Sequence, residues 1–229
     1  MIKLGVPSKG RLMEKTFDWF AARGIILRKA GSERDYAGSV DGLDGLELVL
    51  MSAGEIPREL ALGRLHLGVT GSDLVQEKVA FWDTRLRILA EMGFGGADLV
   101  IAVPQAWVDV DTLDDLDAAA AAFRRVHGVR LRIATKYHRL VRDFLQAQGV
   151  ADYALVDSQG ATEGTVKNET AEAIADITST GETMRANGLK VLADGLIHAS
   201  QATLFKSGAA DWTDADRAVM RQLEDLLGV

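Results

Sequence analysis

The sequence of 229 residues contains no cysteine. Disulfides, thiolate metal sites and a cysteine nucleophile are therefore excluded, and the composition suits a reducing compartment. No apolar run reaches the roughly 18 residues that a membrane-spanning helix needs. The first residues lack the apolar stretch and small-residue cleavage site of a signal peptide. These absences predict a cytoplasmic protein without a membrane segment.

Signatures of several site types are also missing. The four histidines, His66, His127, His138 and His198, show no metal-ligand spacing. No Gly-x-Ser-x-Gly elbow is present, which argues against a serine hydrolase. No Gly-x-x-x-x-Gly-Lys-[Ser/Thr] motif is present, which argues against a P-loop. The net charge of −7 disfavours general binding to nucleic acid or to an anionic membrane.

The sequence does contain a clear α/β pattern. Hydrophobic residues make up 48% and charged residues 26%, as in ordinary soluble globular proteins. Alternating apolar runs and helical periodicity predict an α/β class with mostly parallel sheets. We expect strands over 2–6, 46–51, 67–69, 86–90, 98–104, 131–134, 154–156, 173–177, 191–196 and 198–205. We expect helices over 13–22, 56–62, 74–78, 113–126 and 138–148, and a terminal helix capped by Thr213.

The segment 175–188 is the most informative one. An apolar strand ends at Asp176, small and hydroxyl-bearing residues follow, and a short helix closes at Asn187-Gly188. Such a turn presents backbone N–H groups and hydroxyls, which suit a phosphate. A strand–helix turn capped only for its own stability is the alternative, because Ser and Thr also cap helices.

Charged residues near other strand ends are further candidates. Lys9 and Arg11 flank a glycine after the first strand and suit a pyrophosphate, although a basic surface turn is the alternative. Arg34 stands in a polar stretch with no evident core role. Asp73 could cap a helix or contact a nucleoside. Glu163, in a glycine-flanked loop, could bind ribose hydroxyls or hydrated Mg²⁺, or be solvated.

Taken together, these segments resemble the short form of ATP phosphoribosyltransferase, the first enzyme of histidine biosynthesis. The matching pieces occur in family order along almost the whole chain. They are Ser8-Lys9-Gly10-Arg11, Glu55-Ile56-Pro57, Gly68-Val69-Thr70-Gly71-Ser72-Asp73, Gly93-Phe94-Gly95, Ala134-Thr135-Lys136-Tyr137, Gly160-Ala161-Thr162-Glu163 and the segment 176–189. The last piece is similar to the family's phosphoribosyl pyrophosphate loop and is the most specific.

The resemblance implies a reaction and roles for residues. N1 of ATP displaces pyrophosphate from C1 of phosphoribosyl pyrophosphate, with Mg²⁺ held mainly by substrate. The implied 5′-phosphate cradle is Ser179, Thr180, Gly181, Glu182 and Thr183. Asp176 and Glu163 are implied to hold ribose hydroxyls or the Mg²⁺–substrate complex. The implied contacts to departing pyrophosphate are Lys9, Arg11 and Arg34, and those lining the ATP side are Gly71, Asp73, Thr135, Lys136 and Tyr137.

The resemblance also implies an architecture and partners. The expected fold is two α/β domains around a cleft, like type II periplasmic binding proteins. Domain I is expected over 1–93 plus 190–229, and domain II over 94–189. A homodimer within a hetero-oligomer is implied, with a regulatory subunit similar to histidyl-tRNA synthetase. Two other readings stay open at this point: an anion receptor of the same fold, and an inactive homologue serving as a scaffold.

Overall fold

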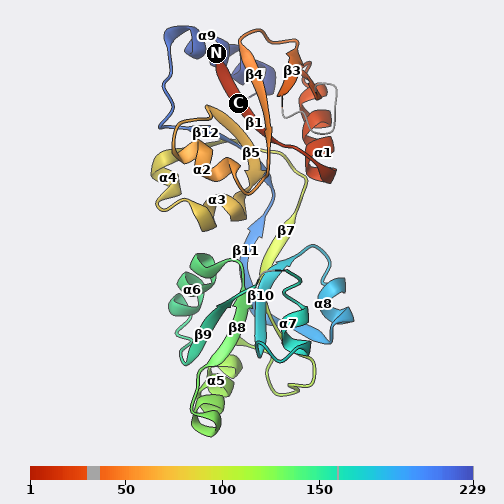
Figure 1. Cartoon of the computed structure of the whole chain (residues 1–229), viewed down its shortest axis with the longest axis vertical. Helices are drawn as coiled ribbons and strands as arrows, with labels where there is room; N and C mark the ends of the chain where they lie inside the picture. The colour runs from red at the N-terminus through yellow and green to blue at the C-terminus, as the bar shows by residue number, and fades with distance from the viewer. Residues whose placement is uncertain (30–36, 159, 229) are drawn as a thin grey trace. The chain divides into compact units, whose positions relative to one another are not determined.

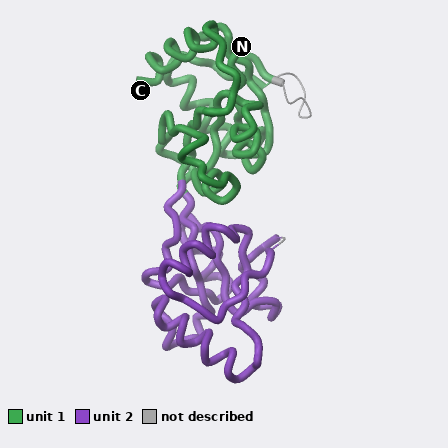
Figure 2. The backbone as a smooth tube through the Cα atoms, turned by 90° about the vertical axis from the view of Figure 1, so that its left-hand side faces the viewer, with its two compact units in different colours: residues 1–96, 201–229 green, residues 97–200 purple. Residues whose placement is uncertain are grey.

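The structure, a computed structural model, describes residues 1–29, 37–158 and 160–228. The chain forms two compact units, coloured separately in Figure 2. Unit 1 comprises Met1–Gly96 and Gln201–Val229, and unit 2 comprises Ala97–Ser200. Figure 1 shows that each unit has its own sheet with helices around it. None of the described helices is long and apolar enough to cross a membrane.

Unit 1 is built on a mixed sheet. Its described strands run in the order β2-β3-β4-β1-β5-β12-β6, in which β1 is parallel to both β4 and β5. The strands are β1 (Ile2–Pro7), β2 (Ile26–Lys29), β3 (Ala37–Asp41), β4 (Leu46–Met51), β5 (Leu67–Gly71), β6 (Leu86–Glu91) and β12 (Ala202–Ser207). The helices are α1 (Gly10–Ala21), α2 (Ile56–Ala61), α3 (Ser72–Lys78), α4 (Trp82–Arg85) and α9 (Asp214–Leu227).

Unit 2 is built on a second mixed sheet. Its described strands run in the order β11-β7-β10-β8-β9, in which β8 is parallel to both β10 and β9. The strands are β7 (Ala97–Pro104), β8 (Leu131–Thr135), β9 (Tyr153–Asp157), β10 (Ala173–Thr178) and β11 (Leu189–Ser200). The helices are α5 (Leu113–His127), α6 (His138–Ala147), α7 (Gly164–Lys167) and α8 (Glu182–Ala186).

Local sequence explains the central elements. In β1, Ile2, Leu4 and Val6 are fully buried, as expected for β-branched and aliphatic residues of a central parallel strand. Helix α9 begins at the predicted cap: Thr213 accepts a hydrogen bond from the backbone N–H of Asp216, whose carboxylate accepts one from the Thr213 N–H. This reciprocal pairing satisfies two donors at the helix start.

The structure corrects several expectations. Six of the ten described strand pairings are antiparallel, so the prediction of mostly parallel sheets is wrong. The runs 191–196 and 198–205 are not two strands, because β11 continues through bulges to Ser200 and the break comes at Gln201. The unit boundaries fall at 96/97 and 200/201. Residues 190–200 group with unit 2 because β11 pairs with β7.

Candidate active site

Three loops of unit 2 lie next to one another at one edge of the sheet. Strands β10, β8 and β9 are parallel neighbours, with Ala175 opposite Thr135 and Thr135 opposite Asp157. Their carboxyl ends therefore meet at the same edge, which is where α/β folds bind ligands. The described residues that follow them outside helices and strands are 179–181, 136–137, and 158 with 160–163. Candidate residues from distant parts of the sequence are brought together here.

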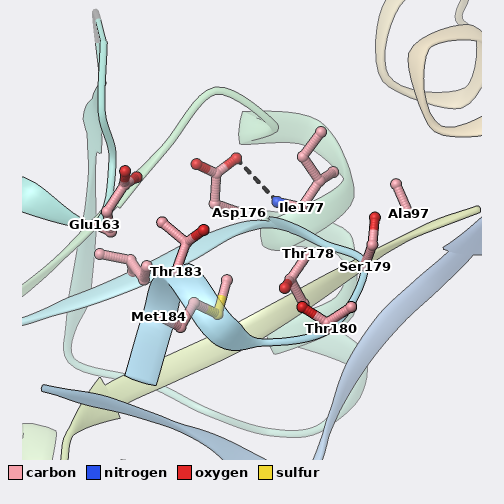
Figure 3. A pocket seen from close by; sticks show the side chains of 10 residues that line it. Ala97, Glu163, Asp176, Ile177, Thr178, Ser179, Thr180, Thr183 and Met184 are labelled. Atoms are coloured by element: carbon pink, nitrogen blue, oxygen red, sulfur yellow. Dashed lines mark hydrogen bonds between the residues drawn. The ribbon is translucent and has the colours of Figure 1, made fainter. Parts of the chain in front are cut away.

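A cavity of about 260 Å³ opens at the end of β10. Five predicted substrate-binding residues line it: Glu163, Asp176, Ser179, Thr180 and Thr183. Figure 3 shows the two carboxylates and the hydroxyl groups around this hollow. The remaining lining residues are Ala97, Ile174, Ile177, Thr178 and Met184. Hydroxyl groups against an apolar wall match the makeup of small-molecule sites, in which few polar groups fix orientation.

The loop after β10 holds its shape through its own hydroxyl groups. Gly181 has a φ of 71° and lies at the start of α8. Its backbone N–H donates to Oγ1 of Thr178 at 2.8 Å, and the Glu182 N–H donates to Oγ1 of Thr180 at 3.3 Å. The Glu182 side chain is exposed and is not among the cavity-lining groups. The unfavourable charge of Glu182 therefore stays outside the hollow.

Arg185 is a cation beside this loop that the sequence analysis did not single out. Its Nη2 donates to the carbonyl oxygen of Thr180 at 3.0 Å. A Cβ added at Gly181 would lie 2.9 Å from Nη1 of the same guanidinium. The contact forms because the first turn of α8 brings Arg185 back to the residues before the helix. Arg185 thus adds positive charge to a loop that otherwise carries only Glu182.

The loop of Glu163 is fixed by buried hydroxyl groups. Oγ of Ser158 and Oγ1 of Thr162 lie 2.8 Å apart, and Thr162 is fully buried. Nζ of Lys136 donates to the carbonyl oxygen of Gly160 at 2.7 Å. The loop after β8 is therefore joined to the loop that carries Glu163.

The predicted ATP-side residues differ in what they can contact. Thr135 is fully buried, and its Oγ1 accepts a hydrogen bond from the Tyr137 N–H at 2.9 Å. Tyr137 is 6% exposed, so these two side chains mainly shape the turn, whereas Lys136 is exposed. Gly71 and Asp73 belong to unit 1, where Gly71 ends β5 and Asp73 is buried in the first turn of α3. Helix α3 begins at Ser72, two residues before the predicted start at residue 74.

Two of the three basic candidates, Lys9 and Arg11, lie in unit 1. Lys9 precedes α1 and lines a second cavity, of about 650 Å³. The other described residues that line it are Ser8, Lys29, Leu50, Met51, Ser52 and Glu55. Arg11 is exposed in the first turn of α1 and does not line this cavity. Arg34 lies outside the described residues. The structure thus joins Lys9 with Lys29, a residue that the sequence analysis did not consider.

An ion pair supports the strands under the unit 2 site. Arg132 of β8 donates from Nε to Glu172 at 3.1 and 3.2 Å, and its backbone N–H donates to the same carboxylate at 2.7 Å. Burial alone would raise the pKa of Glu172, but the hydrogen bonds from Arg132 outweigh it and lower the pKa. Since Glu172 directly precedes β10, this pair ties β8 to the strand that leads into the loop.

Comparison with known proteins gives a consistent family. The model of the family described as ATP phosphoribosyltransferase matches residues 52–227. An ATP phosphoribosyltransferase from Cereibacter sphaeroides is 73% identical over 214 residues, which are 93% of this chain and 91% of that protein.

Two solved structures show the fold. A chain of the ATP phosphoribosyl transferase (HisG:HisZ) complex from Thermotoga maritima superposes with a TM-score of 0.73 at 21% identity, covering 100% of this chain and 96% of that chain. A histidine kinase sensor domain with similarity to periplasmic binding proteins superposes at 0.53 and 11% identity, covering 100% and 89%. The two α/β units therefore have a periplasmic-binding-protein-like fold, as expected.

The family match argues against the anion receptor left open by the sequence, because the family is one of enzymes. The chain belongs to the ATP phosphoribosyltransferase family, and it transfers the 5-phosphoribosyl group of phosphoribosyl pyrophosphate to N1 of ATP in the first step of histidine biosynthesis.

Proposed function

We propose that the cavity at the end of β10 binds the 5-phosphoribosyl part of phosphoribosyl pyrophosphate. The observation that carries this proposal is the set of hydroxyls and two carboxylates around one hollow. Ser179, Thr180 and Thr183 offer hydroxyls to the 5′-phosphate, and Gly181 and Glu182 offer backbone N–H groups. The hydroxyls of Thr178 and Thr180 accept these N–H groups in the structure, and a bound phosphate shares them as a second acceptor.

Asp176 and Glu163 bind the ribose hydroxyls or the Mg²⁺ that accompanies the substrate. Their oxygens suit a hard cation, which usually takes one or two carboxylates and keeps substrate and water oxygens. Among the described residues, no three His, Cys, Asp or Glu side chains are grouped so that they could hold a metal ion. When bound, Mg²⁺ neutralises negative charge that builds up on the phosphate oxygens.

The remaining contacts follow from the reaction. N1 of ATP is the nucleophile and C1 of the sugar the electrophile, so the protein has to orient two substrates and stabilise charge. Lys9, Arg11 and Arg34 stabilise the departing pyrophosphate. Gly71 and Lys136 contact ATP, whereas the buried Asp73, Thr135 and Tyr137 hold the neighbouring turns in shape.

The chain acts in the cytoplasm as the short form of the enzyme. The similarity to the Cereibacter sphaeroides protein, of which the chain covers 91%, supports the short form. A homodimer then joins a regulatory subunit similar to histidyl-tRNA synthetase. The HisG:HisZ complex from Thermotoga maritima supports such a partner.

Substrate binding tests the unit 2 site. Phosphoribosyl pyrophosphate with Mg²⁺ is titrated into the wild-type chain, Thr183→Val and the control Thr170→Val by calorimetry. Thr170 is exposed in the same unit but does not line the cavity. We expect weaker binding only for Thr183→Val. Equal affinity of all three proteins would contradict the role of Thr183, and no binding by any of them would contradict the site.

Turnover with ATP, pyrophosphatase and the regulatory subunit is followed by absorbance of the ribosylated adenine.

A further inference from the structure

The cavity of unit 1 lies where three strands end on the same side. Strand β4 is parallel to β1, and β2 runs in the same direction because both β2 and β4 are antiparallel to β3. Lys29 is the last residue of β2, Met51 the last of β4, and Ser8 directly follows β1. All three residues line the cavity. Lys29 is therefore presented at the carboxyl edge of the sheet, the usual ligand edge of an α/β fold.

The lining of this cavity favours an anion. It includes two ammonium groups, from Lys9 and Lys29, and two hydroxyls, from Ser8 and Ser52. The carboxylate of Glu55 also lines it, and one of its oxygens already accepts a hydrogen bond from the Ser52 N–H at 3.2 Å. Two lysines against one glutamate make the described lining positive, although the whole chain has a net charge of −7. A positive hollow in an acidic protein concentrates anionic ligands.

We propose that Lys29 acts with Lys9 as a second polyphosphate-binding lysine of the enzyme. This inference rests on the proposed function, which assigns Lys9 to the departing pyrophosphate. The shared chemistry is a chain of linked phosphates, which is either the pyrophosphate of phosphoribosyl pyrophosphate or the triphosphate of ATP. A cavity of about 650 Å³ has room for either group. Lysine suits this task because its compact ammonium group can serve several phosphate oxygens without a fixed geometry.

The neighbouring residue offers a matched control. Successive side chains of a strand point to opposite faces, so Arg28 and Lys29 lie on different faces of β2. Arg28 pairs with Asp41 at 3.0 Å, its side chain is 64% exposed, and it does not line the cavity. Lys29→Ala and Arg28→Ala therefore remove the same formal charge from the chain, but only the first removes it from the cavity. Lys29→Arg keeps the charge and tests whether charge alone is sufficient.

The first experiment measures binding of inorganic pyrophosphate to the four proteins by calorimetry. We expect the affinity of Lys29→Ala to fall about ten- to a hundredfold, as for loss of one charged hydrogen bond. The pyrophosphate affinity of Lys29→Arg should fall less, and that of Arg28→Ala should equal the wild-type affinity. Equal melting temperatures of the two alanine variants show that Lys29→Ala is folded. Equal pyrophosphate affinity and equal KM values in both alanine variants would overturn the proposal.

Steady-state kinetics then distinguish the two sources of phosphate. A raised KM for phosphoribosyl pyrophosphate, with weaker inhibition by pyrophosphate, assigns Lys29 to the pyrophosphate. A raised KM for ATP alone assigns it to the triphosphate. The wild-type chain could bind pyrophosphate and yet give no product with its regulatory subunit. That result would contradict the proposed function but not the binding of polyphosphate by Lys29. An active wild-type enzyme whose Lys29→Ala variant behaves like Arg28→Ala would contradict only the role of Lys29.

Discussion

The hydroxyl of Thr178 accepts a hydrogen bond from the backbone N–H of Gly181 at 2.8 Å. This bond spans the turn between β10 and α8 and holds Gly181 in its left-handed conformation. Because the cavity is lined by residues on both sides of the turn, its shape depends on this contact. The loop is therefore organised by its own side chains.

Replacing Thr178 by valine should weaken binding of phosphoribosyl pyrophosphate. Valine keeps the branched shape but loses the acceptor for the Gly181 N–H. One lost hydrogen bond of about 1 kcal/mol corresponds to about a fivefold rise in KM. Thr178→Ser, which keeps the hydroxyl, should stay near the wild-type value. An unchanged KM in the valine variant would show that the contact does not organise the site.

Two glycine-to-alanine changes separate backbone strain from crowding at the site. Gly181 and Gly188 have φ values of 71° and 70°, so alanine at either position should cost about 1 kcal/mol of stability. At Gly188 an added Cβ meets nothing within 4 Å, whereas at Gly181 it lies 2.9 Å from Nη1 of Arg185. Both variants should melt at similar temperatures. Only Gly181→Ala should raise the KM for phosphoribosyl pyrophosphate, and a similar rise in Gly188→Ala would contradict this.

Loss of the Arg185 side chain should weaken substrate binding at low salt. Its guanidinium donates to the Thr180 carbonyl and so places a positive charge beside the loop. We expect the KM for phosphoribosyl pyrophosphate to rise about tenfold in Arg185→Ala and by a smaller factor in Arg185→Lys. At high salt the rise in Arg185→Ala should be smaller, because salt screens the charge of the wild-type arginine. Arg125→Ala removes an exposed arginine from α5 in the same unit and serves as the control. Equal KM values for the two alanine variants would exclude this role.

Asp176→Asn tests the carboxylate while preserving the local fold. Asparagine can still accept the Ile177 N–H, which Oδ1 of Asp176 accepts at 2.9 Å, so the change mainly removes charge. We expect kcat/KM to fall about ten- to a hundredfold and half-maximal activity to require more Mg²⁺. Asp98→Asn changes an exposed aspartate of β7 outside the cavity and should leave both values unchanged. If Asp176→Asn needs no more Mg²⁺ than the wild type, Asp176 binds the ribose hydroxyls and not the Mg²⁺.

The Arg132–Glu172 pair should make unit 2 sensitive to acid. The pKa of Glu172 is lower in the folded protein than its ordinary value of 4.5. A lowered pKa adds stability that is fully present above pH 4.5 and is lost as the pH falls through the folded value. Because the Arg132 side chain is 39% exposed, screening limits the contribution to about 1 kcal/mol.

Hydrogen exchange in β8 and β10, measured against pH, checks this expectation. Glu172→Gln should lower protection at neutral pH and flatten its pH dependence below pH 4.5. Glu169→Gln keeps the backbone carbonyl that Nη2 of Arg132 contacts, so it is a suitable control. A wild-type pH profile in Glu172→Gln would contradict the assignment.

Sequence patterns predicted those elements in which local and tertiary preferences agree. The apolar run that ends at Asp176, the small residues after it and the cap at Thr213 have strong local signals, and the structure has β10, α8 and α9 there. Strands β2 and β3 were not predicted, because they are short and include charged residues such as Arg28 and Asp41. Strand β11 was divided at residue 197, because the register shifts by which the strand continues to Ser200 depend on its pairing with β7 and leave no local signal.

Strand direction and long-range contacts could not be predicted in this way. Alternation of strands and helices indicates parallel sheets, but hairpin partners such as β2 and β3 are antiparallel. Lys29 and Arg185 were not predicted as site residues, because isolated cations carry no local signal. Their positions depend on which strands end together and on how a helical turn folds back.

The pairing of β7 with β11 has a consequence for the way in which the chain enters and leaves unit 2. Ala97 lies opposite Ser200, the first and last residues of unit 2, and the Ala202 N–H donates to the Phe94 carbonyl at 2.9 Å within unit 1. Unit 2, which is inserted into unit 1, therefore begins and ends at two paired residues. Excision of 97–200 with a short bridge leaves the ends of unit 1 in place, so the two halves could be exchanged between relatives as modules.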